Sequence, residues 1–116
     1  MNRVIAFRIW DKHNKKMIES GATPSMLSLF FEKTAALNVQ DGMPYLQFTG
    51  LLDKNGVKIF EGDVVNVDYN HIGKQVVVFE NGAFCVAGYD LKRCEVVGNV
   101  FQSPELIGAQ NAKTTD

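Results

Sequence analysis

The stretch that decides the fold is LQFTGLLDKNGVKIFEGDVV, at residues 46–65. It holds two turn signals, DKNG at 53–56 and Glu61-Gly62, between short runs of apolar and β-branched residues. Asn-Gly tolerates the positive φ angles that a tight hairpin needs. The pattern therefore predicts strands on both sides of DKNG and a corner between strands at Glu61-Gly62.

Short apolar runs separated by turn residues continue downstream of this stretch. DVVNVDY (63–69) alternates, which places Val65, Val67 and Tyr69 on one face. KQVVVFE (74–80), AFCVAGY (83–89) and CEVVGNVF (94–101) are further strand candidates, separated by turns such as NHIG and Asn81-Gly82. About five short, evenly spaced strands between residues 57 and 101 predict a small barrel, which also hides strand edges.

Upstream, the pattern predicts a hairpin and then an ambiguous segment. RVIAFRIW (3–10) is apolar on both faces, DKHNKK forms a polar turn, and KMI returns as a short strand. Over 24–37, Thr23 and Pro24 suit a helix start and Asn38 suits its end. The run SMLSLFF fits a strand equally well, so helix and strand both stay open.

These observations predict a mainly β (α+β) chain with three parts. Residues 1–45 form an N-terminal arm of hairpin and ambiguous segment, residues 46–107 a small SH3-like β-barrel domain, and residues 108–116 a disordered tail. The length of 116 residues suits a single compact domain with such an arm.

Net charge, the N-terminal stretch and the cysteines together indicate the class of protein. Net charge is −1, from 12 Lys and Arg against 13 Asp and Glu, which disfavours a globally basic nucleic-acid binder. The N-terminal stretch is too briefly apolar for a signal peptide or a membrane span. The two cysteines, Cys85 and Cys94, have no CxxC spacing and suit reduced thiols. We expect a soluble cytoplasmic protein with no cofactor and no membrane contact.

The carboxylates Asp53, Glu61 and Asp63 lie close together in sequence, so they suit either a cation or acid–base site or the corners between strands. Corners are favoured, because acids and glycines are common there. His13 and His71 fit no metal motif, and GxGxxG, Walker, GxSxG and HExxH motifs are absent. We therefore predict no catalytic, cofactor-binding or metal-binding residue and no enzymatic activity.

A partner surface is the alternative to a reactive site. Small barrels present aromatic residues to single-stranded nucleic acid or extended peptides, and residues 1–20 carry a local basic excess. The candidate surface combines both features: Arg8, Trp10, Lys12, Lys15, Lys16 and Tyr69. The apolar run MLSLFF predicts self-association through the 24–37 region, as a homo-oligomer.

Several stretches together resemble the YopX family of small bacteriophage and prophage proteins. They are FRIWDKHNKKM (7–17), LQFTGLLDKNGVKIFEGDVV (46–65), VVFENGAF (77–84) and VVGNVFQSPELI (96–107). The resemblance implies a β-rich, SH3-like C-terminal domain behind a variable N-terminal part, in the cytoplasm of a bacterial host. It implies no particular activity or ligand, and it is weakest over 20–43.

Three functions follow from these features. The leading hypothesis is a non-enzymatic binding or adaptor module that contacts host or phage machinery. The second is a nucleic-acid-binding accessory protein that uses the basic N-terminal hairpin. The third is a small metal-dependent enzyme that uses Asp53, Glu61 and Asp63, which requires these carboxylates to converge in space.

Overall fold

The structure is a computed structural model that describes residues 4–106. The described chain is mainly β with one α-helix, as predicted. Its strands are β1 (Phe7–Asp11), β2 (Lys16–Glu19), β3 (Leu46–Leu52), β4 (Lys58–Phe60), β5 (Asp63–Val67), β6 (Gly73–Val76), β7 (Phe79–Glu80), β8 (Ala83–Phe84) and β9 (Cys94–Asn99). The helix is α1 (Pro24–Val39), and two short 3₁₀ helices are η1 (Cys85–Gly88) and η2 (Leu91–Arg93). The expected tail at 108–116 lies outside the described residues.

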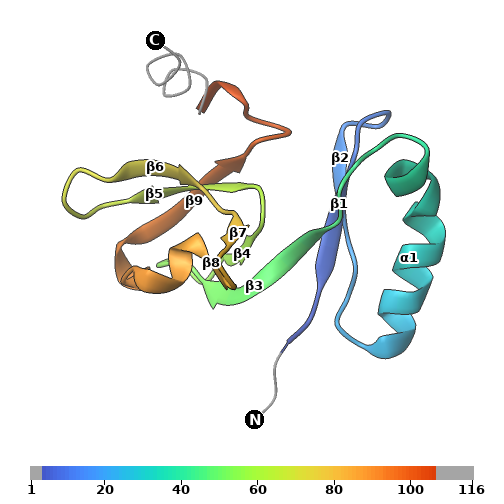
Figure 1. Cartoon of the computed structure of the whole chain (residues 1–116), viewed down its shortest axis with the longest axis horizontal. Helices are drawn as coiled ribbons and strands as arrows, with labels where there is room; N and C mark the ends of the chain where they lie inside the picture. The colour runs from blue at the N-terminus through green and yellow to red at the C-terminus, as the bar shows by residue number, and fades with distance from the viewer. Residues whose placement is uncertain (1–3, 107–116) are drawn as a thin grey trace.

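The strands form antiparallel sheets of order β2-β1-β3-β4, β6-β5-β9 and β7-β8. Figure 1 shows the hairpin and α1 on one side and β5, β6 and β9 on the other, with β3 running between them. The sheets curl into a half-barrel, and the more specific SH3-like architecture stays a prediction. β3 pairs with both β1 and β4, so one sheet crosses the expected boundary after residue 45.

Strand β1 of the N-terminal hairpin is covered on both faces. Successive side chains of a strand point to opposite faces. Phe7 contacts Phe31 of α1 with ring centroids 5.5 Å apart, whereas Trp10 stacks on Phe101 at 6.3 Å. Odd positions of β1 therefore face α1 and even positions face the half-barrel, which explains why both faces of the sequence are apolar.

Residues 24–39 form a helix and not a strand. The Thr23 hydroxyl accepts a hydrogen bond from the Met26 N–H at 3.2 Å, and proline occupies the first turn. The helix ends at Val39, one residue beyond the expected Asn38. Phe30 and Thr34 are buried against the rest of the fold, so tertiary packing selects the helix.

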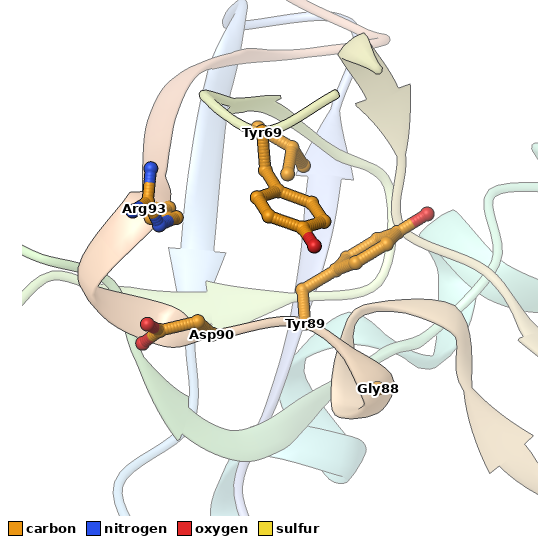
Figure 2. Close-up of a pocket in the computed structure, with 6 residues that line it drawn as sticks. Tyr69, Gly88, Tyr89, Asp90 and Arg93 are labelled. Carbon is orange, nitrogen blue, oxygen red and sulfur yellow. The ribbon is translucent and has the colours of Figure 1, made fainter. Parts of the chain in front are cut away.

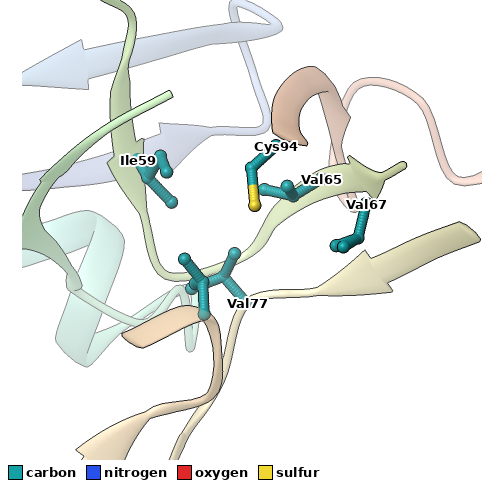
Figure 3. Close-up of a cluster of buried hydrophobic side chains, with 6 residues drawn as sticks. Ile59, Val65, Val67, Val77 and Cys94 are labelled. Atoms are coloured by element: carbon teal, nitrogen blue, oxygen red, sulfur yellow. The ribbon is translucent and has the colours of Figure 1, made fainter. Parts of the chain in front are cut away.

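The main core lies within the half-barrel. Figure 3 shows Ile59, Val65, Val67, Val77 and Cys94 converging on one cluster, which also contains Val86. Val65 and Val67 share this face as predicted. Tyr69, which was expected on the same face, does not lie there, because β5 ends at Val67 and the chain then turns.

Two predicted strands are broken, and the cause is the same in each. β6 stops at Val76 because Val77 turns inward; its N–H donates to the Asp63 carbonyl at 2.8 Å. The segment 83–89 forms only the short β8 and then η1, because Val86 turns inward as well. Cys85, expected in a core strand, is exposed.

The corner at Gly62 provides a test of the turn chemistry. Its φ is +83°, a region that side-chain-bearing residues rarely adopt. We expect Gly62→Ala to lower the free energy of unfolding by about 1–2 kcal/mol. Gly88→Ala is the matched control, because Gly88 lacks a positive φ and a Cβ there meets nothing within 4 Å. Equal stabilities of the two variants in urea denaturation would contradict this account.

Candidate functional site

The three clustered acids each hold a corner of the backbone. The Asp53 carboxylate accepts hydrogen bonds from the N–H groups of Asn55 at 2.8 Å, Val57 at 2.9 Å and Val96 at 2.8 Å. Burial alone would raise the pKa of Asp53, but these backbone donors lower it below its usual value. Asp53 therefore ties the 53–56 turn to β9.

The other two acids bind different backbone groups. Glu61 accepts from the Gln47 N–H at 2.9 Å, and Asp63 accepts from the Phe60 N–H at 2.8 Å. Burial raises the pKa of Asp63, although the Arg8 guanidinium that ion-pairs with it acts in the opposite direction. Within residues 4–106, no group of three or more His, Cys, Asp or Glu side chains is arranged to hold a metal ion.

Arg8 does not belong to the predicted partner surface. It is only 8% exposed, and its guanidinium lies over the Phe60 ring at 4.4 Å while it pairs with Asp63. The alternation of β1 places it on the half-barrel side. The prediction of an exposed Arg8 was wrong because a strand with two covered faces leaves no free face for a charge.

The rest of the predicted surface is divided between separate places. Trp10 is half-buried, whereas Lys12, Lys15 and Lys16 are exposed at the hairpin turn. Tyr69 lies in the β5–β6 turn, which Figure 1 shows well away from the β1–β2 turn. The fold therefore does not bring Tyr69 and the lysines onto one surface.

The basic hairpin turn already has partners in the same chain. His13 Nε2 lies 3.0 Å from the Asp41 carboxylate, and Lys12 Nζ lies 3.5 Å from the Asp41 carbonyl. Asp41 follows α1, so these contacts join the turn to the end of the helix. The positive charge here is partly compensated within the fold.

Tyr69 instead belongs to a pocket that the sequence did not predict. The pocket has a volume of about 320 Å³ and is formed by the β5–β6 turn and the segment from η1 to η2. Figure 2 shows the Tyr69 ring between Arg93 on one side and Tyr89 on the other. We call this the tyrosine pocket; its lining residues are Val67, Tyr69, Gly88, Tyr89, Asp90 and Arg93.

Contacts around the tyrosine pocket hold its charged groups in place. The Arg93 guanidinium lies 5.5 Å from the centre of the Tyr69 ring and donates to the Asp68 carbonyl at 3.2 Å. Asp90 caps η2, because one carboxylate oxygen accepts from the Lys92 N–H at 3.0 Å. Arg93 therefore positions the Tyr69 ring, and the second oxygen of Asp90 has no hydrogen bond to any described residue.

The two tyrosines offer unused polar groups. Among residues 4–106, no hydrogen bond involves the hydroxyl of Tyr69 or of Tyr89, although Tyr89 packs its ring against the main core. Tyr69 is 52% exposed. The pocket thus supplies aromatic surfaces, two hydroxyls and a carboxylate oxygen, a set suited to holding a ligand by stacking and hydrogen bonds.

Tyr89, Asp90 and Arg93 were missed because residues 83–89 were interpreted as a continuous strand. The signal was present in YDLKR (89–93), where Asp90 is a typical residue for capping a short turn. That signal predicts a break after the strand but not which side chains will face Tyr69.

Comparison with known proteins identifies the family of the chain and a similar fold. The family described as YopX protein matches residues 6–108. The chain belongs to the YopX family. A crystal structure of protein EF1440 from Enterococcus faecalis is similar to this YopX-family chain, with a TM-score of 0.61 and 26% sequence identity, covering 91% of this chain and 99% of that one. No curated protein matches the chain.

The single α-helix of residues 4–106 is neither long nor apolar enough to cross a membrane.

Proposed function

We propose that this YopX-family protein is a non-enzymatic binding or adaptor module that contacts host or phage machinery in the bacterial cytoplasm. The observation that carries the proposal is the tyrosine pocket, where two tyrosine hydroxyls without a hydrogen-bond partner among residues 4–106 lie beside Arg93. Tyr and Arg, together with Trp, are enriched among the residues that contribute most of the binding energy at protein interfaces. The pocket would hold an extended segment of a protein partner.

A protein partner suits this pocket better than nucleic acid does. Asp90 and Arg93 both line the pocket, so their formal charges cancel and the pocket offers a phosphate backbone no net positive charge. The exposed lysines that would bind phosphate lie in the hairpin turn, apart from the stacking rings. A single-stranded nucleic acid would need phosphate-binding lysines and stacking rings along one continuous path.

We expect the substitution Tyr69→Ala to weaken capture of the partner by about tenfold, which corresponds to loss of one aromatic anchor. The test is capture by tagged protein from bacterial lysate, with and without nuclease, quantified by mass spectrometry. Phe79→Ala is the matched control, because Phe79 is an exposed aromatic residue, 55% exposed, outside the pocket. Equal capture by both variants would argue against the tyrosine pocket.

The same experiment addresses the nucleic-acid alternative. Partners that disappear with nuclease, and whose capture falls when Lys12, Lys15 and Lys16 are changed to Gln, would favour the hairpin and overturn the proposal. Partners that survive nuclease and depend on Tyr69 would support it.

We also propose that the protein self-associates through the 24–37 region. Met26 and Leu29 of α1 are 54% and 51% exposed, so the helix presents large apolar side chains outside its buried face. Exposed apolar side chains that gather at one place on a surface commonly mark an interaction site.

A further inference from the structure

We infer that a cavity between the N-terminal hairpin and the half-barrel binds a small zwitterion, an α-amino acid with an apolar side chain. The cavity has a volume of about 300 Å³, at the lower end of the range for small-molecule sites. We call it the arginine pocket; its lining, from β1, β2, β4, β5 and β9, includes Arg8, Glu19, Lys58, Phe60, Asp63 and Asn99. It shares no lining residue with the tyrosine pocket, so this inference is independent of the proposed function.

Arg8 is a buried cation with unused hydrogen-bond donors. A guanidinium carries five N–H donors, and that of Arg8 has one hydrogen-bond partner among residues 4–106, the Asp63 carboxylate. The Arg8 Nε is buried and has no partner within the described chain. A buried donor without a partner is costly, and native proteins rarely contain one. Because Arg8 lines a cavity, its unused donors indicate an acceptor that comes from outside the chain.

The other buried polar groups of the arginine pocket have partners within the chain. Asp63 uses one carboxylate oxygen for Arg8 and the other for the Phe60 N–H. The Asn99 side-chain oxygen accepts from two backbone N–H groups of the segment that follows β9. The unused hydrogen-bonding capacity of the interior therefore lies chiefly on Arg8, and a donor of this kind suits a carboxylate as its acceptor.

The rim of the arginine pocket adds one free charge of each sign. Glu19 lies opposite Arg8 in the β1–β2 register, so the two side chains share one face of the hairpin. Glu19 and Lys58 are both exposed, and neither forms an ion pair with any of residues 4–106. Since Arg8 and Asp63 neutralise each other, the two rim charges leave the pocket neutral but bipolar. A ligand of one sign would be attracted by one rim residue and repelled by the other, whereas a zwitterion is attracted by both.

These groups define how the ligand is held. Its carboxylate accepts hydrogen bonds from Arg8 and Lys58, and its ammonium donates to the Glu19 carboxylate. Val57 and Val96 also line the pocket and offer apolar surface to the side chain of the ligand. Leucine carries all three features, a carboxylate, an ammonium and an aliphatic side chain, and is therefore the probe of choice.

Titration of the isotopically labelled protein with leucine, followed by amide chemical shifts, tests the inference. We expect saturable shifts at Arg8, Glu19 and Lys58, while the signals of Tyr69 and Tyr89 stay unchanged. Isocaproate lacks the ammonium of leucine and isoamylamine lacks its carboxylate, so each should bind at least tenfold more weakly through loss of one charged contact. An absence of saturable shifts with leucine, the result expected if water alone fills the pocket, would overturn the inference, and so would equal binding of the three compounds.

Two rim substitutions separate the roles of the charges and leave the buried ion pair intact. Glu19→Gln should weaken the binding of leucine at least tenfold and leave that of isocaproate no weaker, whereas Lys58→Gln should weaken both. Lys12→Gln is the matched control, because Lys12 is an exposed lysine outside the pocket, and it should change neither. All three positions are exposed, so urea denaturation should show unchanged stability. Leucine binding that is equal in the three variants would overturn the inference.

Discussion

Replacing Asp63 by Ala is expected to lower the free energy of unfolding by about 3–5 kcal/mol, the usual effect of removing one partner of a buried ion pair. Asp63 is 2% exposed and Arg8 is 8% exposed, so Arg8 would be left as an uncompensated buried charge. The same substitution removes the acceptor for the Phe60 N–H. Urea denaturation at neutral pH measures the effect.

Two further variants make this prediction specific to the ion pair. Asp68→Ala removes an exposed carboxylate at the end of β5 and should change stability by less than about 0.5 kcal/mol. Adding Arg8→Met to Asp63→Ala should recover part of the loss, because no unpaired charge then remains in the interior. A loss below about 1 kcal/mol for Asp63→Ala would show that the pair does not join the hairpin to the half-barrel.

Replacing Asp53 by Ala is expected to lower the free energy of unfolding by about 2–3 kcal/mol. The substitution removes the acceptor for the N–H groups of Asn55, Val57 and Val96, and the last of these lies on β9, far along the chain. Asp90→Ala is a suitable control, because its carboxylate caps only the short η2. A loss no larger than that of Asp90→Ala would contradict the role of Asp53 as a tie between turn and sheet.

Asp53 also makes stability depend on pH in a definite direction. Its pKa in the folded protein is below the ordinary value of 3.8, so near and below that pH the folded state binds fewer protons than the unfolded state. The contribution is present above pH 3.8 and is lost as pH falls through the folded value. Asp53→Asn should therefore lose less stability than wild type between about pH 5 and pH 3.

The sequence predicted the features that depend on local chemistry. The turns at 53–56 and Glu61-Gly62, the hairpin and the corner role of the acids all follow from residues that prefer turns or accept backbone hydrogen bonds. The helix start also follows from Thr23 and Pro24, although the choice between helix and strand over 24–37 depended on packing against the hairpin.

The features that depend on tertiary structure were not predicted. Two expected strands are interrupted at Val77 and Val86, whose side chains are buried in the main core. No turn-forming residue in the local sequence marks these two positions. The burial of Arg8 requires Asp63, which is 55 residues away in the chain. The tyrosine pocket is formed by Tyr69 and a segment about twenty residues later in the chain. Periodicity within strands does not predict which distant side chains lie next to each other in the fold.

The measurement that tests the central claim most directly is a chemical-shift titration of the isotopically labelled protein with the partner captured from lysate. We predict that the amide signals of Tyr69, Tyr89, Asp90 and Arg93 shift together, and that Tyr69→Ala moves the midpoint of these shifts to about tenfold more partner while leaving the rest of the spectrum in place. Shifts confined to the lysines of the hairpin turn or to α1, with the tyrosine pocket unchanged, would contradict the claim.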